Sequence, residues 1–324
     1  MKALSDVEAR TKLAGSNKLE VLMFSLGVDS RTGRRETFGI NVFKVREVMR
    51  APAVTAAPEM AKAVRGMASL RGALVPVVSL AEYIGMPTDA ASQIMIVTEY
   101  NGRVQGFLVE SVDTILRLDW SEMRVPPEML TANMAGLVTA VTELADGRLI
   151  MMLDVERILA ETTSYDDKEM ALKSIKPIDI SDATIFFADD SSVARGQIVR
   201  TLDALGIKHM SAVNGRSAWD DLQRIAAHAQ SCGKKTSEFI RLVLTDVEMP
   251  EMDGYMLTKQ IKGDARFVGI PVIMHSSLSS DSNRQLGVSV GVDEYVPKFE
   301  PDKLAEALTR RLTGATLPPM VAAR

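Results

Sequence analysis

The stretch that decides the fold of the second half of the chain is residues 242–262, LVLTDVEMPEMDGYMLTKQIK. It opens with three apolar residues, a short run that is typical of a strand buried on both faces of a parallel sheet. Asp246 follows this strand, and the Asp253–Gly254 pair indicates a loop that leads into a helix. Because a carboxylate at the end of a buried strand is costly unless it is paired, we expect other parts of the chain to supply partners for Asp246.

The sequence around this stretch alternates strand and helix patterns. Five such units predict a doubly wound α/β domain, with a five-stranded parallel sheet and helices on both of its faces. Ligands of such folds bind at the carboxyl ends of the strands. The expected strands are 184–189, 207–213, 240–246, 270–275 and 291–296, and the expected helices are 193–205, 216–230, 254–263, 280–287 and 301–312.

Polar side chains of complementary charge come at the ends of the other strands. Asp189 and Asp190 end the first strand, Ser276 follows the fourth, and Lys298 follows the fifth. A parallel sheet brings all of them to one edge, beside Asp246. At about 5 Å and an effective dielectric of about 20, each pair of carboxylates repels by roughly 3 kcal/mol. A divalent cation relieves this repulsion, and Mg²⁺ prefers oxygen ligands of this kind.

This set of residues is suited to phosphoryl transfer. With Mg²⁺ bound, the Asp246 carboxylate can act as a nucleophile toward a phosphoryl group. The metal, the Lys298 ammonium and the Ser276 hydroxyl can then hold the phosphoryl oxygens.

The first half of the chain has a β pattern with an internal repeat, in which residues 38–50 resemble residues 105–118. Each copy follows an apolar strand and precedes a glycine-marked hairpin, at 69–80 and 143–155. This pattern predicts an all-β domain of two small barrels side by side. Its apolar matched positions are expected in the core, and no catalytic set is evident, which favours a binding module. The matched pairs are Gly39 with Gly106, Val42 with Val109, Val45 with Val112, and Arg50 with Arg117.

Composition narrows the class of protein. A length of 324 residues, 46% hydrophobic and 25% charged, is typical of a soluble protein of two domains. The net charge of −4 gives no electrostatic basis for binding nucleic acid. The single cysteine, Cys232, excludes an internal disulfide, and no signal peptide or membrane span is evident. We therefore expect a cytoplasmic protein without direct membrane insertion.

Residues 184–312 resemble a response-regulator receiver domain, which has a flavodoxin-like fold. Four separated motifs carry the resemblance: the Asp189–Asp190 pair, TDVEMPEMDG around Asp246, PVIMHSS with Ser276, and EYVPK with Lys298. The chain departs from the receiver pattern at Phe299, where a proline usually follows the lysine. The segment between Asp190 and Asp246 is also longer than usual, with the surplus near Cys232.

The resemblance implies a role for each matched residue. Asp189, Asp190, Asp246 and the backbone carbonyl of Glu248 would bind Mg²⁺. Asp246 would be the phosphoacceptor, assisted by Ser276 and Lys298, and Tyr295 would be an aromatic switch that changes rotamer. Such a receiver is not an enzyme beyond self-phosphotransfer and autodephosphorylation.

Residues 17–160 resemble the CheW family of chemotaxis coupling proteins, with SH3-like barrels, through FGINVFKVREVM and GMASLRGALVPVVSL. A CheW-like domain followed by a receiver is the layout of CheV-type coupling proteins. The expected boundaries are 17–160 for the coupling domain, 161–182 for a linker and 183–314 for the receiver. By this resemblance Arg71 contacts partners within the array of receptors and kinase.

The resemblance implies a chemotaxis adapter that couples methyl-accepting chemoreceptors to a CheA-type histidine kinase at the inner face of the membrane. Phosphorylation of Asp246 would regulate it, for adaptation or as a phosphate sink. Three alternatives stay open: a scaffold whose receiver is not phosphorylated, an aspartyl-phosphate hydrolase, and a DNA-binding regulator. The hydrolase is disfavoured by Glu248 where a second aspartate is usual, and the DNA-binding regulator by the near-neutral β-rich half.

Overall fold

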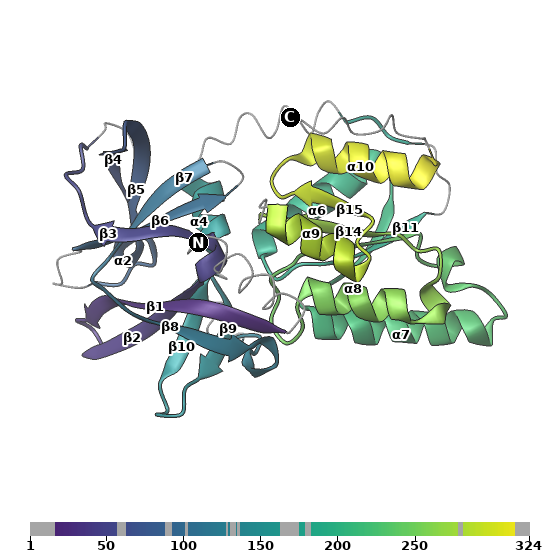
Figure 1. Cartoon of the computed structure of the whole chain (residues 1–324), viewed down its shortest axis with the longest axis horizontal. Helices are drawn as coiled ribbons and strands as arrows, with labels where there is room; N and C mark the ends of the chain where they lie inside the picture. Colours follow the sequence, from purple (N-terminus) through teal and green to yellow (C-terminus); the bar gives the residue numbers. More distant parts are fainter. Residues whose placement is uncertain are drawn as a thin grey trace, which may run out of the picture. The chain divides into compact units, whose positions relative to one another are not determined.

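The structure is a computed structural model that describes residues 17–56, 63–87, 93–100, 103–127, 129, 134, 137–162, 175–178, 183–277 and 281–314. The chain divides into two compact units, the first of which comprises residues 17–164. Figure 1 shows that this first unit is built mainly of strands, whereas the other alternates strands and helices. In the described part of the chain, no helix is long and apolar enough to cross a membrane.

The first unit contains two five-stranded sheets, as the repeat predicts. One sheet has the order β8-β1-β2-β10-β9 and the other has the order β3-β6-β7-β5-β4. The strands of the first are β1 (Lys18–Asp29), β2 (Arg34–Asn41), β8 (Ser111–Asp119), β9 (Val138–Glu143) and β10 (Leu149–Leu153). The strands of the second are β3 (Val45–Arg50), β4 (Val64–Leu70), β5 (Ala73–Ser79), β6 (Ile94–Tyr100) and β7 (Arg103–Val109).

The two sheets are copies of one arrangement. In each, the central strand pairs antiparallel on one side and parallel on the other: β2 with β1 and β10, β7 with β6 and β5. The matched glycines lie at equivalent points on these central strands. A Cβ at Gly39 would lie 2.6 Å from a Val21 methyl carbon, and one at Gly106 would lie 2.6 Å from the Met95 sulfur. A side chain at either place would therefore displace neighbouring core side chains.

Apolar residues of both sheets form one shared core. Phe24 and Phe38 from the first sheet and Val78 and Phe107 from the second belong to the same buried cluster. The repeat positions Val42, Val45, Val109 and Val112 lie in or against this cluster, which confirms their expected place in the core. Short helical segments complete the unit: η1 (Val42–Lys44), α2 (Leu80–Tyr83), η2 (Trp120–Glu122) and α4 (Val155–Thr162).

The second unit contains the predicted parallel sheet. Its order is β12-β11-β13-β14-β15, and all four of its strand pairs are parallel. The strands are β11 (Thr184–Ala188), β12 (Lys208–Ala212), β13 (Leu242–Thr245), β14 (Val272–Ser276) and β15 (Glu294–Pro297). The helices are α6 (Ser192–Leu205), α7 (Gly215–Ser231), α8 (Gly254–Gly263), α9 (Asp281–Val290) and α10 (Pro301–Thr313), with the single turns η3 (Thr236–Glu238) and η4 (Ala265–Phe267).

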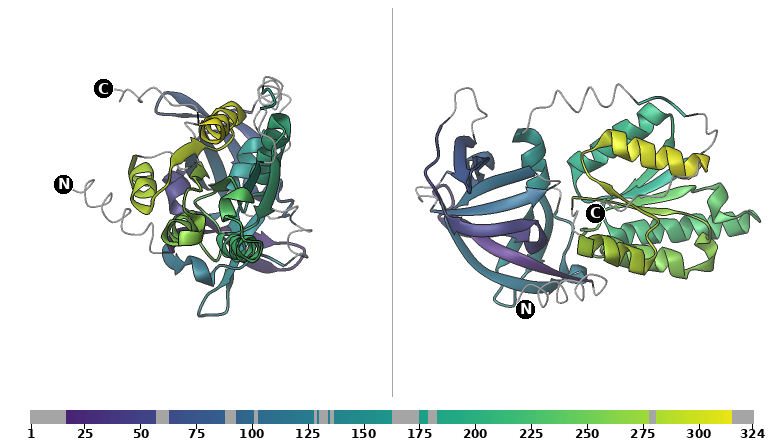
Figure 2. Two further views of the ribbon diagram at one scale, coloured as in Figure 1. Left: turned by 90° about the vertical axis from the view of Figure 1, so that its right-hand side faces the viewer. Right: turned by 45° about the horizontal axis from the view of Figure 1, so that its top comes forward.

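Successive side chains of β11 lie on opposite faces of this sheet. Ile185 and Phe187 belong to one buried cluster, together with residues of α6 and α10. Phe186 belongs to the other, together with residues of α7 and α8. Figure 2 shows the sheet between these helical layers. Because both faces are covered, the strands are continuous apolar runs rather than alternating ones.

Part of the expected linker packs on the second unit. Ile175 and Ile178 lie against the cluster beneath α6 and α10, and the Ile178 amide donates a hydrogen bond to the Leu205 carbonyl at 3.1 Å. That carbonyl belongs to the last turn of α6, where helical partners run out. The boundaries 17–160, 161–182 and 183–314 stay predictions.

Candidate phosphoacceptor and metal site

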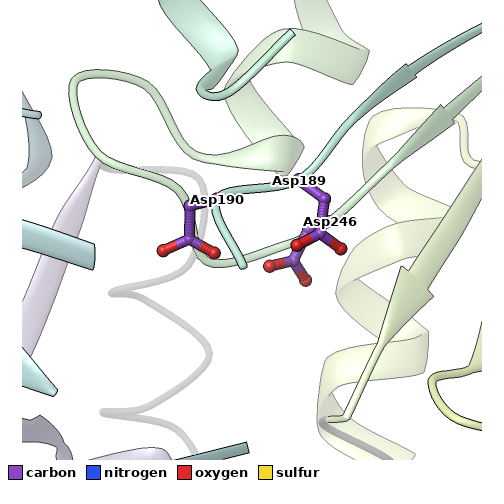
Figure 3. A group of neighbouring side chains, drawn as sticks. All are labelled: Asp189, Asp190 and Asp246. Atoms are coloured by element: carbon purple, nitrogen blue, oxygen red, sulfur yellow. The ribbon is translucent and has the colours of Figure 1, made fainter. Parts of the chain in front are cut away.

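The sheet brings the three predicted aspartates together. Asp189 and Asp190 follow β11, and Asp246 follows the neighbouring strand β13, so their carboxyl groups meet at the carboxyl edge of the sheet (Figure 3). One oxygen from each carboxylate lies within 4.8 Å of the others. Asp189 and Asp246 are buried, whereas Asp190 is half-buried.

Backbone amides orient the two buried carboxylates. The Ser191 amide donates to Asp189 Oδ1 at 2.9 Å, and the Val247 amide donates to Asp246 Oδ1 at 2.7 Å. In each case one carboxylate oxygen is fixed by the main chain of the following loop. Hydrogen bonds of this kind stabilise the ionised form of a carboxylate.

Lys298 lies between the same two carboxylates. Its Nζ is 2.9 Å from Asp246 Oδ2 and 3.1 Å from Asp189 Oδ2, and its side chain is 1% exposed. The unusual Phe299 therefore does not prevent the lysine from reaching the site. Phe299 itself has a positive φ of 63°, a strained conformation for a bulky residue.

The loop between β13 and α8 makes a close turn beneath Asp246. The Gly254 amide donates to the Val247 carbonyl at 2.9 Å, and Asp253 caps α8 by accepting from the Met256 amide. A Cβ at Gly254 would lie 1.9 Å from the Asp246 carbonyl oxygen. Glycine is therefore required here because the backbone of α8 touches the backbone of the candidate phosphoacceptor.

The other predicted receiver residues lie around the same edge. Glu248 is buried in the loop after Asp246, and Ser276 is buried as the last residue of β14. Tyr295, on β15, directs its buried hydroxyl toward Ser276 and Tyr255, outside good hydrogen-bonding geometry with any described residue. The chemical roles predicted for Glu248, Ser276 and Tyr295 stay predictions.

The environment of Tyr295 gives an alkaline test of its position. Burial raises the pKa of Tyr295 to about 12; the Ser276 hydroxyl opposes this shift and the Asp246 charge adds to it. The folded state therefore favours the neutral phenol. This contribution to stability is complete below pH 10, the ordinary pKa, and is lost as the pH rises to about 12.

We expect Tyr295→Phe to reduce the loss of unfolding free energy between pH 10 and pH 12. The rise of the Tyr295 pKa from 10 to about 12 corresponds to about 2–3 kcal/mol. Urea titration of the parent and the variant at each pH measures the difference. The same dependence on pH in both chains would contradict a buried Tyr295 hydroxyl.

Arg71 belongs to the other unit and to a different kind of surface. It occupies the turn between β4 and β5 with a positive φ of 49°, next to Gly72. Its side chain is 69% exposed and pairs with Glu47 at 2.8 Å. The structure thus places Arg71 on an exposed hairpin tip, and its contact with partners stays a prediction.

One residue beside the three aspartates was not predicted from the sequence. Arg195, in the first turn of α6, donates from Nη1 to the carbonyl oxygens of both Asp189 and Asp190, at 2.9 Å each. The spacing between the Asp189–Asp190 pair and Arg195 could have indicated this contact. Arg195 lies one turn into the helix after the pair, from where a long side chain can reach back to the loop.

The donor set fits Mg²⁺. Three carboxylates offer oxygens within 4.8 Å of one another, and Lys298 pairs with two of them, Asp189 and Asp246. Hard oxygen ligands of this kind suit Mg²⁺, which also keeps several waters. Asp189, Asp190 and Asp246, with the backbone carbonyl of Glu248, are the groups that would hold the ion.

Comparison with known proteins agrees with this architecture. The family model of the CheW-like domain matches residues 20–163, and that of the response regulator receiver domain matches residues 185–309. Chemotaxis protein CheV3 of Helicobacter pylori is 28% identical over 302 residues, which cover 91% of this chain and 95% of CheV3. CheV2 of the same organism is 28% identical over 324 residues, which cover 95% of this chain and 99% of CheV2. Chemotaxis protein CheY1 of Helicobacter pylori is 33% identical over 126 residues, which cover 38% of this chain and 92% of CheY1.

Fold, site and domain order together define a CheW-like domain joined to a response-regulator receiver domain. The chemotaxis proteins CheV3 and CheV2 match along more than nine tenths of the chain. The chain belongs to the CheV-type family of chemotaxis proteins, and it is a chemotaxis adapter that carries a receiver domain.

Proposed function

We propose that this adapter couples chemoreceptors to a CheA-type histidine kinase and that a phosphoryl group on Asp246 regulates the coupling. The observation that carries the proposal is the buried set of Asp189, Asp246 and Lys298, with Asp190 beside it. These residues are candidates for the chemical roles that acyl phosphate formation needs.

The transfer needs only the phosphohistidine donor and a proton from solvent. A carboxylate oxygen of Asp246 attacks the phosphorus of a phosphohistidine on the kinase. The P–N bond breaks, a P–O bond forms, and the imidazole nitrogen that leaves takes up a proton from solvent. Bound Mg²⁺ supplies charge neutralisation for the phosphoryl oxygens. Lys298, 2.9 Å from Asp246, holds a phosphoryl oxygen, and the Ser276 hydroxyl donates to another.

The phosphorylated state differs from the free state by charge. A phosphoryl group brings about −1.5 to −2 charges at pH 7 and three strong acceptors. The Ser276 hydroxyl turns toward it, and Tyr295, whose hydroxyl is already buried beside Ser276, is held in that inward position. Since Tyr295 belongs to β15, this change alters the surface of β15 and α9, which is the two-state element of the switch.

The coupling domain provides the docking surface. Arg71, at the exposed tip of the β4–β5 hairpin, is proposed to contact the receptor–kinase assembly. An exposed guanidinium at a rigid turn can form bidentate contacts with a partner carboxylate. The assembly would place the chain at the inner face of the membrane through its partners.

A reconstituted assembly tests the proposal. Receptor-containing vesicles, the kinase and the full chain are combined with Mg²⁺, and kinase activity is followed before and after the chain is phosphorylated. The parent should change kinase activity on phosphorylation. Asp246→Asn should still couple receptor to kinase, but without that change. If the parent and Asp246→Asn give the same time course, the chain is a scaffold with a silent receiver.

Arg71 is tested in the same assembly. Arg71→Ala should leave phosphorylation of Asp246 intact but reduce the amount of chain that sediments with the vesicles. Arg65→Ala is the matched control, because Arg65 is an exposed arginine of β4 that also pairs with a glutamate, Glu82. Equal sedimentation of the two variants would remove Arg71 from the docking surface.

A further inference from the structure

Arg195 makes an unusual pair of contacts with the acidic loop. One guanidinium nitrogen, Nη1, donates to the carbonyl oxygens of two successive residues, Asp189 and Asp190, at 2.9 Å each. The half-buried side chain comes from the first turn of α6, a helix of 14 residues. Arg195 therefore links the loop of candidate metal ligands to a rigid element.

These two carbonyls belong to the short segment between β11 and α6. The ladders of β11 end at Ala188, which pairs with Ala212 and Thr245. α6 begins at Ser192, with Ser191 as its N-cap. The carbonyls of Asp189 and Asp190 lie between these two structures, and the Arg195 side chain donates to both of them. A charged donor gives the stronger kind of hydrogen bond.

We propose that Arg195 is a positioning residue for the metal site. By fixing the carbonyls of Asp189 and Asp190, it holds the two peptide groups that follow these residues in one orientation. Both carboxylates then face Asp246 before Mg²⁺ binds, so that the ion does not have to order the loop. This inference rests on the proposed function, since it concerns the same site.

The positive charge of Arg195 opposes Mg²⁺ binding, whereas its positioning of the ligands favours it. A guanidinium beside three carboxylates repels an incoming cation, so its removal alone would tighten Mg²⁺ binding. The contacts of Arg195 are with carbonyls rather than carboxylates, and its side chain is partly open to solvent, which screens the charge. We therefore expect the positioning effect of Arg195 to exceed the effect of its charge. The two effects predict opposite changes in Mg²⁺ affinity when Arg195 is replaced.

Calorimetric titration of the full chain with Mg²⁺ decides between them. Arg195→Met removes both the donors and the charge and should weaken Mg²⁺ binding by about tenfold, the lower end for loss of a group that orients metal ligands. Arg195→Lys keeps donors and charge and should recover most of the affinity. Arg200→Met is the control, because Arg200 is an exposed arginine of the same helix, and its affinity should match the parent.

A second readout separates positioning from chemistry. At saturating Mg²⁺, Arg195→Met should accept phosphoryl groups at nearly the rate of the parent, because Arg195 touches no reacting atom. If methionine prevents folding, Arg195→Gln, which removes the charge but retains an amide donor, should show a smaller weakening of the same sign.

The outcomes distinguish this inference from the proposed function. If the parent binds Mg²⁺ and the methionine or glutamine variant binds it equally or more tightly, the positioning role is wrong and the phosphoacceptor site stands. If the parent itself does not bind Mg²⁺, the proposed function fails, and the role of Arg195 fails with it.

Discussion

Replacing Lys298 by methionine is expected to destabilise the receiver by about 3–5 kcal/mol when no Mg²⁺ is present, the usual cost of removing one partner from a buried ion pair. The side chain is 1% exposed and contacts Asp189 at 3.1 Å and Asp246 at 2.9 Å. Methionine fills a similar volume, so the main change is that two buried carboxylates lose their cation. Urea titration of the full chain measures the effect.

Magnesium should reverse much of this loss. A divalent cation at the three carboxylates supplies the positive charge that Lys298→Met removes. Lys303→Met is the control, because Lys303 pairs with Glu300 at the surface, where an ion pair contributes little. An unchanged midpoint of unfolding for Lys298→Met without Mg²⁺ would show that the lysine does not stabilise the acidic edge.

Gly254→Ala is expected to destabilise the receiver by about 3 kcal/mol, the upper part of the range for overpacked sites. The added Cβ would lie 1.9 Å from the carbonyl oxygen and 2.9 Å from the carbonyl carbon of Asp246. These are backbone atoms, so the loop must shift as a whole and Asp246 must move with it. The variant should therefore also accept phosphoryl groups poorly when it is folded.

Gly263→Ala is a matched control for this prediction. Gly263 ends the same helix, α8, and a Cβ there would have no neighbour within 4 Å. Alanine is a better helix former than glycine, so this variant should be stabilised by up to about 0.5–1 kcal/mol. If the two variants have the same stability and the same rate of phosphorylation, the close approach at Gly254 does not position Asp246.

Topology made most of the site predictable from sequence. Asp189, Asp246, Ser276 and Lys298 each lie at or just after the end of a predicted strand, and parallel pairing brings all such ends to one edge. The internal repeat likewise predicted a duplicated β unit, and the structure places Gly39 and Gly106 on the central strands of two sheets with the same arrangement.

Contacts between a side chain and distant backbone were not predictable in this way. The bonds of Arg195 to two carbonyls depend on the path of the loop after β11, which no periodicity encodes. The packing of Ile175 and Ile178 against the receiver was missed because their neighbours are polar and the segment has a linker composition. Both cases depend on tertiary structure rather than on local pattern.

The most direct test of the account is transfer of labelled phosphoryl groups to the chain. The purified full chain and its Asp246→Asn variant are each mixed with the phosphorylated chemotaxis kinase and Mg²⁺, and the label is followed on both proteins. The account predicts rapid transfer to the parent and none to Asp246→Asn. Absence of transfer to the parent, or equal labelling of both chains, would contradict Asp246 as the phosphoacceptor.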